Sequence, residues 1–504
     1  MKYKYLYFSS VAIIVGLIFA FGPSTIEEHQ EIVPGKKRAI NSDMIGVNAN
    51  LVGEYAPEKN VEFIEAIQDL NVKTIRYPGG TIGNYWDWDL GWIDQDVPDN
   101  LMIKWVVTQG LRESKNRYTV EQFAELVHKT NSKPVFMLNM LSKDRAHALR
   151  NLRRAAKAGL EIEYVEMGNE LYFDLPFPKK MYPSPEIYGD TCQAWIAAIK
   201  AEFPKAKCSV LGTTLERHKR QENWTNRVLA HCNNADAITY HKYGPSGLDG
   251  SKERLNITAG TEGSKDLSSA TRHYPGGEMT VADWEKSLLQ DPKAQTNMWV
   301  NAQKTASFYK KLHHDRELPL WITEFNMRDD HSITLHSWAH SLITSVFYLE
   351  FLNGPVEITS VHNLVGGLFG QIYTKGFNTG KPYELTAGGV ATSLFSTAIE
   401  GKTTAIPMEV KDQVFLENDK GERFEGLQVY AFTNEANERS AILINFSANY
   451  KSLQKPDLFT GLNGTIYNQE LAQNVVGWES LKSEKVLANH PNIELPPFSI
   501  CILK

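Results

Sequence analysis

The chain has 504 residues, of which 42% are hydrophobic, 11% aromatic and 22% charged, the proportions of an ordinary globular protein. Its formal net charge of −6 at pH 7 argues against a nucleic-acid partner, because surfaces that bind nucleic acid carry an excess of lysine and arginine. The length suggests two to four domains, although one α/β barrel can take more than roughly 300 residues.

The N-terminus has the pattern of an export signal. Lys2 and Lys4 precede an apolar run from about Leu6 to Phe21. The cleavage site is poor, because Pro23 directly follows the triplet Ala20-Phe21-Gly22. We therefore predict a signal peptide or an N-terminal membrane anchor over residues 1–22, and a body that is secreted, periplasmic or on the cell surface. The membrane would be contacted only through this segment.

Short apolar strands alternate with amphipathic helices from about residue 43, which is typical of βα units around a parallel sheet. The predicted strands are Met44–Asn50, Thr74–Tyr77, Pro134–Asn139, Tyr164–Met167, Ser209–Gly212, Ala237–Tyr240, Leu320–Thr323 and Ile358–His362. Helical patterns between them include Val61–Leu70 and Val120–Lys129, and Thr119 with Gln122 can open the second as a capping box. Eight repeats of this kind predict a (β/α)8 TIM barrel over residues 43–385.

The pattern changes after about Thr386. One apolar helical stretch, Ala391–Ala398, is followed by alternating runs separated by polar turns. The runs are Gln413–Leu416, Leu427–Phe432, Ser440–Phe446, Gly464–Asn468 and Phe498–Leu503. They predict a C-terminal antiparallel β-sandwich domain over residues 390–504, which a strand at Glu31–Pro34 in the segment 27–42 could join.

Two glutamates end predicted barrel strands. Glu170 closes a Gly-Asn-Glu triplet after the fourth strand, and Glu324 directly follows the seventh. These strands lie on opposite sides of a barrel, so the two carboxylates can face one another across its C-terminal mouth. Retaining glycosidases need two carboxyl groups ~5–5.5 Å apart. The pair therefore predicts a retaining glycoside hydrolase that acts by double displacement on a polysaccharide or oligosaccharide, and the alternative for each glutamate is a strand-end salt bridge.

These residues resemble the clan A glycoside hydrolases, whose acid/base follows an asparagine at the end of strand 4 and whose nucleophile ends strand 7. The resemblance implies that Glu170 is the general acid/base and Glu324 the nucleophile. It also implies that Asn169 binds a substrate hydroxyl beside the scissile bond.

Two segments resemble family 51 α-L-arabinofuranosidases in particular. Residues 75–80, Ile-Arg-Tyr-Pro-Gly-Gly, resemble the Arg-Tyr-Pro-Gly-Gly segment of that family, and residues 238–243, Ile-Thr-Tyr-His-Lys-Tyr, resemble its strand 6 His-x-Tyr. The resemblance implies an arabinofuranosidase-like enzyme of plant or algal polysaccharides. The heparanase- and β-glucuronidase-like family 79 shares the architecture and is the alternative. Three features depart from family 51: the motif Thr-Glu-Phe-Asn around Glu324, a first strand without the glutamate that the family uses on its sugar, and a connection between strands 6 and 7 that is longer than usual in either family.

Three polar residues are candidates to set up the nucleophile. Arg76 ends the second strand, where a cation near Glu324 would keep that carboxylate ionised, and a salt bridge elsewhere in the barrel is the alternative. His241 and Tyr243 could orient Glu324 and hydrogen-bond to it, or could be satisfied polar groups at a strand end.

Other candidates would bind the sugar. Trp86 and Trp88, with the acidic residues between and after them, could form an aromatic platform, and the alternative is one buried and one exposed face. Asn139, at the end of the third strand, is a weaker candidate for a hydroxyl, and His362, at the eighth strand, is weaker still. The basic run Arg217–Arg220 could meet a uronic acid or a sulfate, or could be a solvated loop.

Two other classes of function fit the sequence less well. A metal-dependent hydrolase on this barrel would need histidines on the first strand, which has none, so we expect no metal and no cofactor. The four cysteines match no zinc or redox motif, and two of the first three could pair in an exported protein or remain buried thiols. A non-catalytic carbohydrate-binding barrel is a remote alternative, because both glutamates are present.

Overall fold

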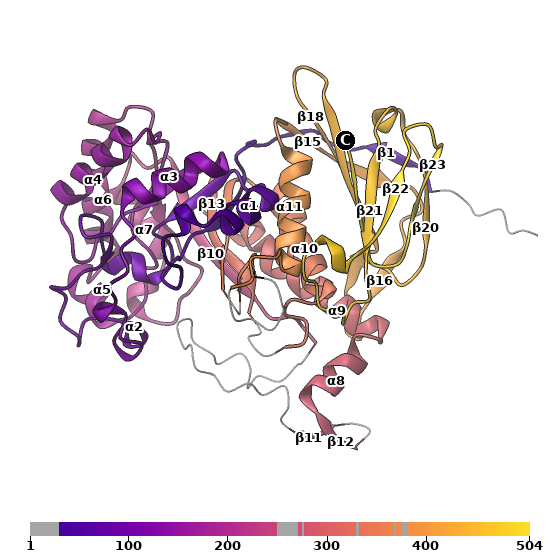
Figure 1. The fold of residues 1–504 in the computed structure, drawn as a ribbon, viewed down its shortest axis with the longest axis horizontal. Coiled ribbons are helices and arrows are strands. Elements are labelled where there is room, and N and C mark those ends of the chain that lie inside the picture. Colours follow the sequence, from indigo (N-terminus) through magenta and orange to yellow (C-terminus); the bar gives the residue numbers. More distant parts are fainter. Residues whose placement is uncertain (1–29, 249–270, 275–276, 329–331, 367–368, 375–381) are drawn as a thin grey trace, which may run out of the picture.

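The structure is a computed structural model that describes residues 30–248, 271–274, 277–328, 332–366, 369–374 and 382–504. The predicted export segment lies outside these ranges. Within them, no helix is long and apolar enough to cross a membrane. A closed barrel and a C-terminal β-sheet domain lie side by side, with the helices α10 and α11 between them (Figure 1).

Eight parallel strands close the barrel, as the sequence predicts. In ring order they are β3 (Ile45–Asn48), β4 (Thr74–Tyr77), β7 (Lys133–Met137), β8 (Tyr164–Glu166), β9 (Lys207–Leu211), β10 (Ala237–Gly244), β13 (Leu320–Met327) and β14 (Val356–Val361). Each coincides with a predicted strand, and the main difference is that β10 and β13 continue to residues 244 and 327. The loops after these strands therefore gather at one end, the C-terminal mouth.

One long helix follows each strand. In chain order these are α1 (Val61–Leu70), α3 (Val120–Thr130), α4 (Arg145–Lys157), α6 (Pro185–Glu202), α7 (Trp224–His231), α9 (Pro292–Ala306), α10 (Trp338–Asn353) and α11 (Ala387–Ile399). Helix α3 begins with the predicted capping box, since Thr119 Oγ accepts from the Gln122 N–H and the Gln122 side chain accepts from the Thr119 N–H at 2.9 Å.

The connections after β4, β8 and β10 carry short elements of their own. These are β5 (Trp86–Asp87), β6 (Trp92–Ile93), α2 (Lys104–Thr108), α5 (Pro176–Met181), β11 (Thr271–Tyr274), β12 (Gly277–Thr280) and α8 (Val281–Leu288). The connections after β4 and β10 are the two longest, as the sequence indicates.

Helix α11 completes the ring of barrel helices. The Thr392 hydroxyl lies 3.0 Å from that of Tyr348 on α10, and the Ser393 hydroxyl donates to the Asp69 carbonyl of α1 at 2.6 Å. The apolar stretch near residue 391, which the sequence analysis placed after the barrel, is therefore the last barrel helix.

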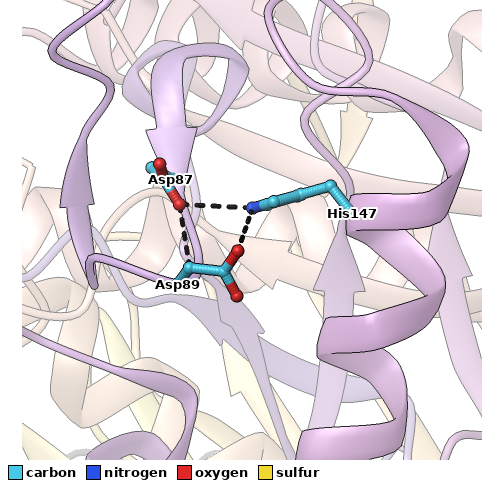
Figure 2. A group of neighbouring side chains, drawn as sticks. All are labelled: Asp87, Asp89 and His147. Carbon is cyan, nitrogen blue, oxygen red and sulfur yellow. Dashed lines mark hydrogen bonds and ion pairs between the residues drawn. The ribbon is translucent and has the colours of Figure 1, made fainter.

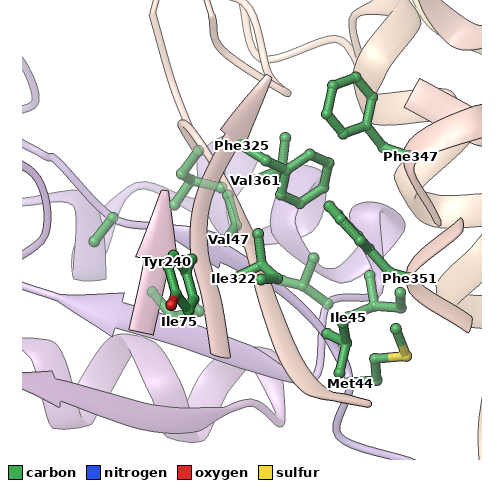
Figure 3. Packing of buried hydrophobic residues seen from close by; sticks show 14 of the residues in the cluster. Met44, Ile45, Val47, Ile75, Tyr240, Ile322, Phe325, Phe347, Phe351 and Val361 are labelled. Atoms are coloured by element: carbon green, nitrogen blue, oxygen red, sulfur yellow. The ribbon is translucent and has the colours of Figure 1, made fainter. Parts of the chain in front are cut away.

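An irregularity in β13 decides where Glu324 points. Phe325 packs against Phe347 and Phe351 of α10, with ring centroids 5.5 and 5.1 Å apart, outside the strand ring (Figure 3). The register of β13 against β14 shifts between Ile322 and Phe325, so strict alternation is interrupted there. Between these two residues, Thr323 contacts Glu166 and Glu324 contacts Arg76, and both therefore point into the barrel.

The C-terminal domain is built on one large sheet. Its strand order is β1-β15-β18-β19-β24-β21-β22, with β2 beside β15, and every pairing is antiparallel. The bounds are β1 (Ile32–Pro34), β2 (Arg38–Ala39), β15 (Thr404–Val410), β18 (Leu427–Thr433), β19 (Arg439–Asn445), β21 (Gly464–Asn468), β22 (Lys482–Val486) and β24 (Ser499–Leu503). The predicted N-terminal strand joins this sheet, since Ile32 pairs with Val410.

Two small antiparallel sheets complete the domain: the hairpin of β16 (Phe415–Glu417) with β17 (Arg423–Glu425), and the pair β20 (Lys451–Gln454) with β23 (Asn492–Leu495). Leu453 and Ile493 of the second pair share an apolar core with Val429 and Leu443 of the large sheet. Apolar side chains from two layers of strands thus meet in one core, which is the sandwich that the sequence predicts.

Candidate active site

The two predicted glutamates lie together at the mouth of the barrel. Glu324 lies on β13 and Glu170 four residues after β8, and both side chains are buried. One carboxylate oxygen of each, together with a ring nitrogen of His241, lie within 4.8 Å of one another. Glu170 has a φ of +48°, a left-handed conformation that is rare outside glycine and that concentrates at functional sites.

Arg76 connects Glu324 with Glu166 and Asn169. Its guanidinium donates to Glu324 Oε1 at 3.0 Å, to Glu166 Oε2 at 2.5 Å and to Asn169 Oδ1 at 2.8 Å. Burial lowers the pKa of Arg76, but the two carboxylates raise it by more, so the guanidinium stays charged. The predicted placement of Arg76 beside Glu324 therefore matches the structure. Glu170, His241 and Glu324 are close enough together to hold a metal ion, but the positive charge of Arg76 already lies 3.0 Å from Glu324.

Glu324 is held as a carboxylate. The Tyr243 hydroxyl donates to its Oε2 at 2.8 Å. Burial raises the pKa of Glu324, but the nearby His241 and Arg76 and the hydrogen bond from Tyr243 outweigh burial and bring the pKa well below its usual range.

His241, on β10, contacts Glu170 more closely than Glu324. Its Nδ1 lies 2.9 Å from Glu170 Oε1 and 3.6 Å from Glu324 Oε2. Burial lowers the pKa of His241, while the two glutamates raise it by more, and the net shift is upward. His241, a predicted partner of Glu324, therefore hydrogen-bonds to Glu170 and orients that residue instead.

Asn169 is fixed in place but keeps one polar atom without a partner. Its backbone N–H donates to Asn84 Oδ1 at 3.0 Å, and Asn84 Nδ2 donates to its carbonyl at 2.6 Å. Its Oδ1 accepts from Arg76, whereas its buried Nδ2 has no hydrogen-bond partner among the described residues. A buried donor without an acceptor is costly, so this atom is suited to a hydroxyl of a ligand.

The predicted aromatic platform is wrong. Trp86 and Trp88 are each only 2% exposed. Trp88 packs edge-to-face on Tyr77, with centroids 5.1 Å apart, and the Trp86 indole N–H donates to the Tyr77 hydroxyl at 3.1 Å. Neither ring presents a face to a sugar, because both are part of the core behind β4.

The acidic residues of the same run are also occupied. Asp87 and Asp89 flank the His147 ring of α4 (Figure 2), with His147 Nε2 3.2 Å from Asp87. These three side chains are close enough to hold a metal ion, but Lys143 lies 2.8 Å from Asp87, and Arg154 lies 3.1 Å from Asp89. The carboxylates therefore tie the loop after β4 to α4 through ion pairs.

Asn139 does not reach the glutamates with an unused group. Its Oδ1 accepts from the N–H groups of Leu141 and Ser142, and its Nδ2 donates to the Trp86 carbonyl and to the Ser142 hydroxyl. An asparagine amide has two donor hydrogens and two lone pairs, and all four are used here. Asn139 therefore has no free group for a substrate hydroxyl, and it instead connects residues 141 and 142 to the backbone of Trp86.

Several site residues were missed in the sequence. They are Glu166, Tyr172, Thr323 and Asn48. His362, the weakest of the predicted hydroxyl-binding candidates, lies 3.0 Å from Asn48 and 3.9 Å from Glu324. The signal for Glu166 was present, because a carboxylate inside a buried apolar strand needs a cationic partner. Nothing local marks Tyr172, whose hydroxyl lies 3.3 Å from Glu170 Oε1.

No protein-family model and no curated protein sequence matches this chain. Among solved structures, it is similar to a family 51 arabinofuranosidase from Xanthomonas axonopodis pv. citri, with a TM-score of 0.65 and 16% identity over 94% of this chain and 98% of the other. A family 51 α-L-arabinofuranosidase from Bifidobacterium longum gives a TM-score of 0.64 at 12% identity, over 94% and 99% of the two chains. A 4-O-α-L-rhamnosyl-β-D-glucuronidase from Fusarium oxysporum gives 0.53 at 12% identity, over the same shares. The chain therefore has the fold of the clan A glycoside hydrolases, as the resemblance in its sequence implied.

Proposed function

We propose that this protein is a retaining glycoside hydrolase in which Glu324 is the nucleophile and Glu170 the general acid/base. The observation that carries the proposal is the approach of the two carboxylates to within 4.8 Å at the mouth of this barrel. Retaining enzymes hold this pair ~5–5.5 Å apart, whereas inverting enzymes leave ~6.5–9.5 Å for a water molecule.

The surroundings of the two glutamates suit different roles. Glu324, with Arg76 and Tyr243 on its oxygens, is kept ionised and is suited to attack the anomeric carbon. Glu170 has His241 and Tyr172 on Oε1, and no described residue hydrogen-bonds to Oε2. It is suited to protonate the leaving oxygen and then to activate water.

The favoured substrate is an α-L-arabinofuranoside of a plant or algal polysaccharide or oligosaccharide. The family 51 motifs in the sequence and the two similar structures support this choice. A glucuronide is the alternative, and it would need a cation beside the sugar. Arg220 of the basic run instead donates to the carbonyls of Leu171, Phe173 and Tyr182, so its guanidinium is already occupied.

The substrate is tested with nitrophenyl α-L-arabinofuranoside beside the corresponding xyloside, glucuronide and galactoside. We expect hydrolysis of the arabinofuranoside, with proton NMR showing that the first-formed sugar keeps its anomeric configuration. A product of inverted configuration would contradict the retaining mechanism. Hydrolysis of the glucuronide alone would show that the substrate is a glucuronide and not an arabinofuranoside.

The roles are tested with Glu324→Ala and Glu170→Ala. Glu324→Ala should be inactive on every substrate, with external anions rescuing it only to product of inverted configuration. Glu170→Ala should keep activity on a dinitrophenyl glycoside, whose leaving group departs without protonation, and azide should speed its turnover and give the retained glycosyl azide. The same pattern with the residues exchanged would reverse the roles, and full activity of either variant on a natural polysaccharide would defeat the proposal.

A further inference from the structure

A buried chain of hydrogen bonds runs from Glu166 to Glu170 through two side chains. The Thr323 hydroxyl donates to Glu166 Oε1 at 2.7 Å, His241 Nε2 lies 3.2 Å from Thr323 Oγ, and His241 Nδ1 lies 2.9 Å from Glu170 Oε1. Glu166 is fully buried and pairs through its other oxygen with Arg76. It therefore acts on Thr323 only as an acceptor.

This chain decides which nitrogen of His241 carries its hydrogen. A hydroxyl has one hydrogen, and Thr323 gives it to Glu166, so the Thr323 oxygen can only accept from His241. His241 Nε2 therefore bears a hydrogen. Nδ1 is left to face Glu170 Oε1, and two atoms 2.9 Å apart share a proton whether it is bound to the carboxyl or to the ring.

Resting on the function proposed above, we propose that His241 is a positioning residue that shares the catalytic proton with Glu170, and that Thr323 and Glu166 lock it in the tautomer that this sharing needs. Glu170 and His241 then act as one acid when the proton lies between them and as one base when it does not. Without the lock, the ring hydrogen could move to Nδ1, satisfy the Glu170 carboxylate and weaken it as a base.

The proton can be followed through both steps. As the glycosidic C–O bond breaks, the leaving oxygen takes the electron pair and the proton held between Glu170 and His241, while Glu324 bonds to the anomeric carbon. The Glu170 carboxylate now faces a lone pair on His241 Nδ1. Water then bonds to the anomeric carbon, the ester bond to Glu324 breaks, and a proton of that water returns to the place between Glu170 and His241.

The charges around His241 keep this proton in place in the free enzyme. The groups that face the ring are Glu170, Glu324 and Glu166, at 2.9, 3.6 and 4.0 Å, and, within electrostatic reach, Arg76 and His362. Three carboxylates oppose two groups that carry or can carry positive charge. The excess of acceptors favours a ring that holds or shares a second proton.

The test compares Thr323→Val, which cannot accept from His241 Nε2, with Thr323→Ser, which keeps the hydroxyl. On a dinitrophenyl glycoside the second step limits the rate and needs the base. Thr323→Val should therefore lower kcat by about tenfold, part of the roughly 10²–10⁴ that acid–base catalysis contributes, and azide should restore it. The basic limb of kcat/KM on a substrate with a poor leaving group should move to lower pH. Thr323→Ser should match the wild type in both measurements.

A loss in Thr323→Val without an azide response or a moved basic limb would reduce Thr323 to a packing role and overturn the inference. Nitrogen-15 NMR of histidine-labelled wild-type protein, with the His241 signal assigned from His241→Gln, needs no Thr323 variant. We expect Nε2 to stay protonated while Nδ1 titrates, and a neutral ring with its hydrogen on Nδ1 would also overturn the inference. If the Glu170 and Glu324 variants behave as expected while these measurements do not, only the proton-sharing inference fails.

Discussion

Tyr243 and Glu324 are joined across neighbouring strands by a hydrogen bond of 2.8 Å from the tyrosine hydroxyl to Glu324 Oε2. Arg76 and Asn48 donate to the other oxygen, Oε1, at 3.0 and 3.2 Å. Both oxygens of the carboxylate are thus held before a substrate arrives. This preorganisation fixes where the proposed nucleophile points and lowers its affinity for a proton.

Tyr243→Phe should slow the first step on every substrate. Losing a hydrogen bond to a charged group costs about 1.5–3 kcal/mol, a factor of about 10–100 in kcat/KM. The loss should be equal for good and poor leaving groups, because attack by Glu324 is common to both. The acid limb of the pH profile should move to higher pH, since the lost bond helps to lower the pKa of Glu324.

Tyr172→Phe is the matched control for Tyr243→Phe. Its hydroxyl contacts Glu170 rather than Glu324, so its effect should be larger for poor leaving groups than for a dinitrophenyl glycoside. The same dependence on the leaving group in both variants would contradict the separate roles of the two glutamates.

Glu324 should also make stability depend on pH. Its pKa in the folded protein lies below the usual value of 4.5, so the folded state binds fewer protons than the unfolded chain at acidic pH. The stabilisation is therefore fully present above pH 4.5 and is lost as the pH falls through the folded pKa. In urea unfolding at about pH 6 and about pH 3.5, wild type should lose more stability than Glu324→Gln.

Glu62→Gln, which changes an exposed carboxylate on α1, serves as the control and should follow the wild type across the same interval. Parallel losses in wild type and Glu324→Gln would mean that Glu324 does not titrate as an ion-paired carboxylate.

The barrel and the glutamate pair could be read from the sequence because each is encoded locally. β8 ends in Glu166, and in β13 the apolar run Leu320–Ile322 leads directly to Thr323 and Glu324. The capping box of Thr119 and Gln122 marks a helix start within four residues. Strand-end positions then place Glu170 and Glu324 at the same mouth, because parallel strands share their C-terminal end.

The tryptophans of the loop after β4 could not be placed in this way. A run that alternates aromatic and acidic residues fits both an exposed sugar platform and a loop with one buried face. Residues far away in the sequence determine which of the two forms, because Trp88 packs against Phe136 of β7 and Asp87 forms an ion pair with Lys143. Likewise, the contact between Thr323 and Glu166 joins residues 157 positions apart, a separation that no local pattern reveals.

The corrected role of Trp88 predicts a stability defect rather than a binding defect. Trp88→Ala removes a buried ring and should lower the free energy of unfolding by about 3–5 kcal/mol. KM on a small aryl glycoside, measured at a temperature where the variant is folded, should stay unchanged. A raised KM with unchanged stability would restore the sugar platform.

Asn169 should act on one substrate hydroxyl through its unpaired Nδ2. Asn169→Ala removes the donor and should lower kcat/KM by about 10–100-fold, which corresponds to the roughly 1–3 kcal/mol lost when a buried polar group loses its partner. Asn169→Asp keeps an oxygen for Arg76 but replaces the donor with an acceptor, so it should lose as much activity as Asn169→Ala.

The decisive measurement for Asn169 uses a substrate that lacks the hydroxyl next to the anomeric carbon. If Nδ2 donates to that hydroxyl, wild type and Asn169→Ala should hydrolyse the deoxy substrate at similar rates, because the interaction is already missing. An equal loss on both substrates would mean that Asn169 acts only by holding Arg76 in place, and Asn169→Asp, which preserves that contact, would then retain most of the activity.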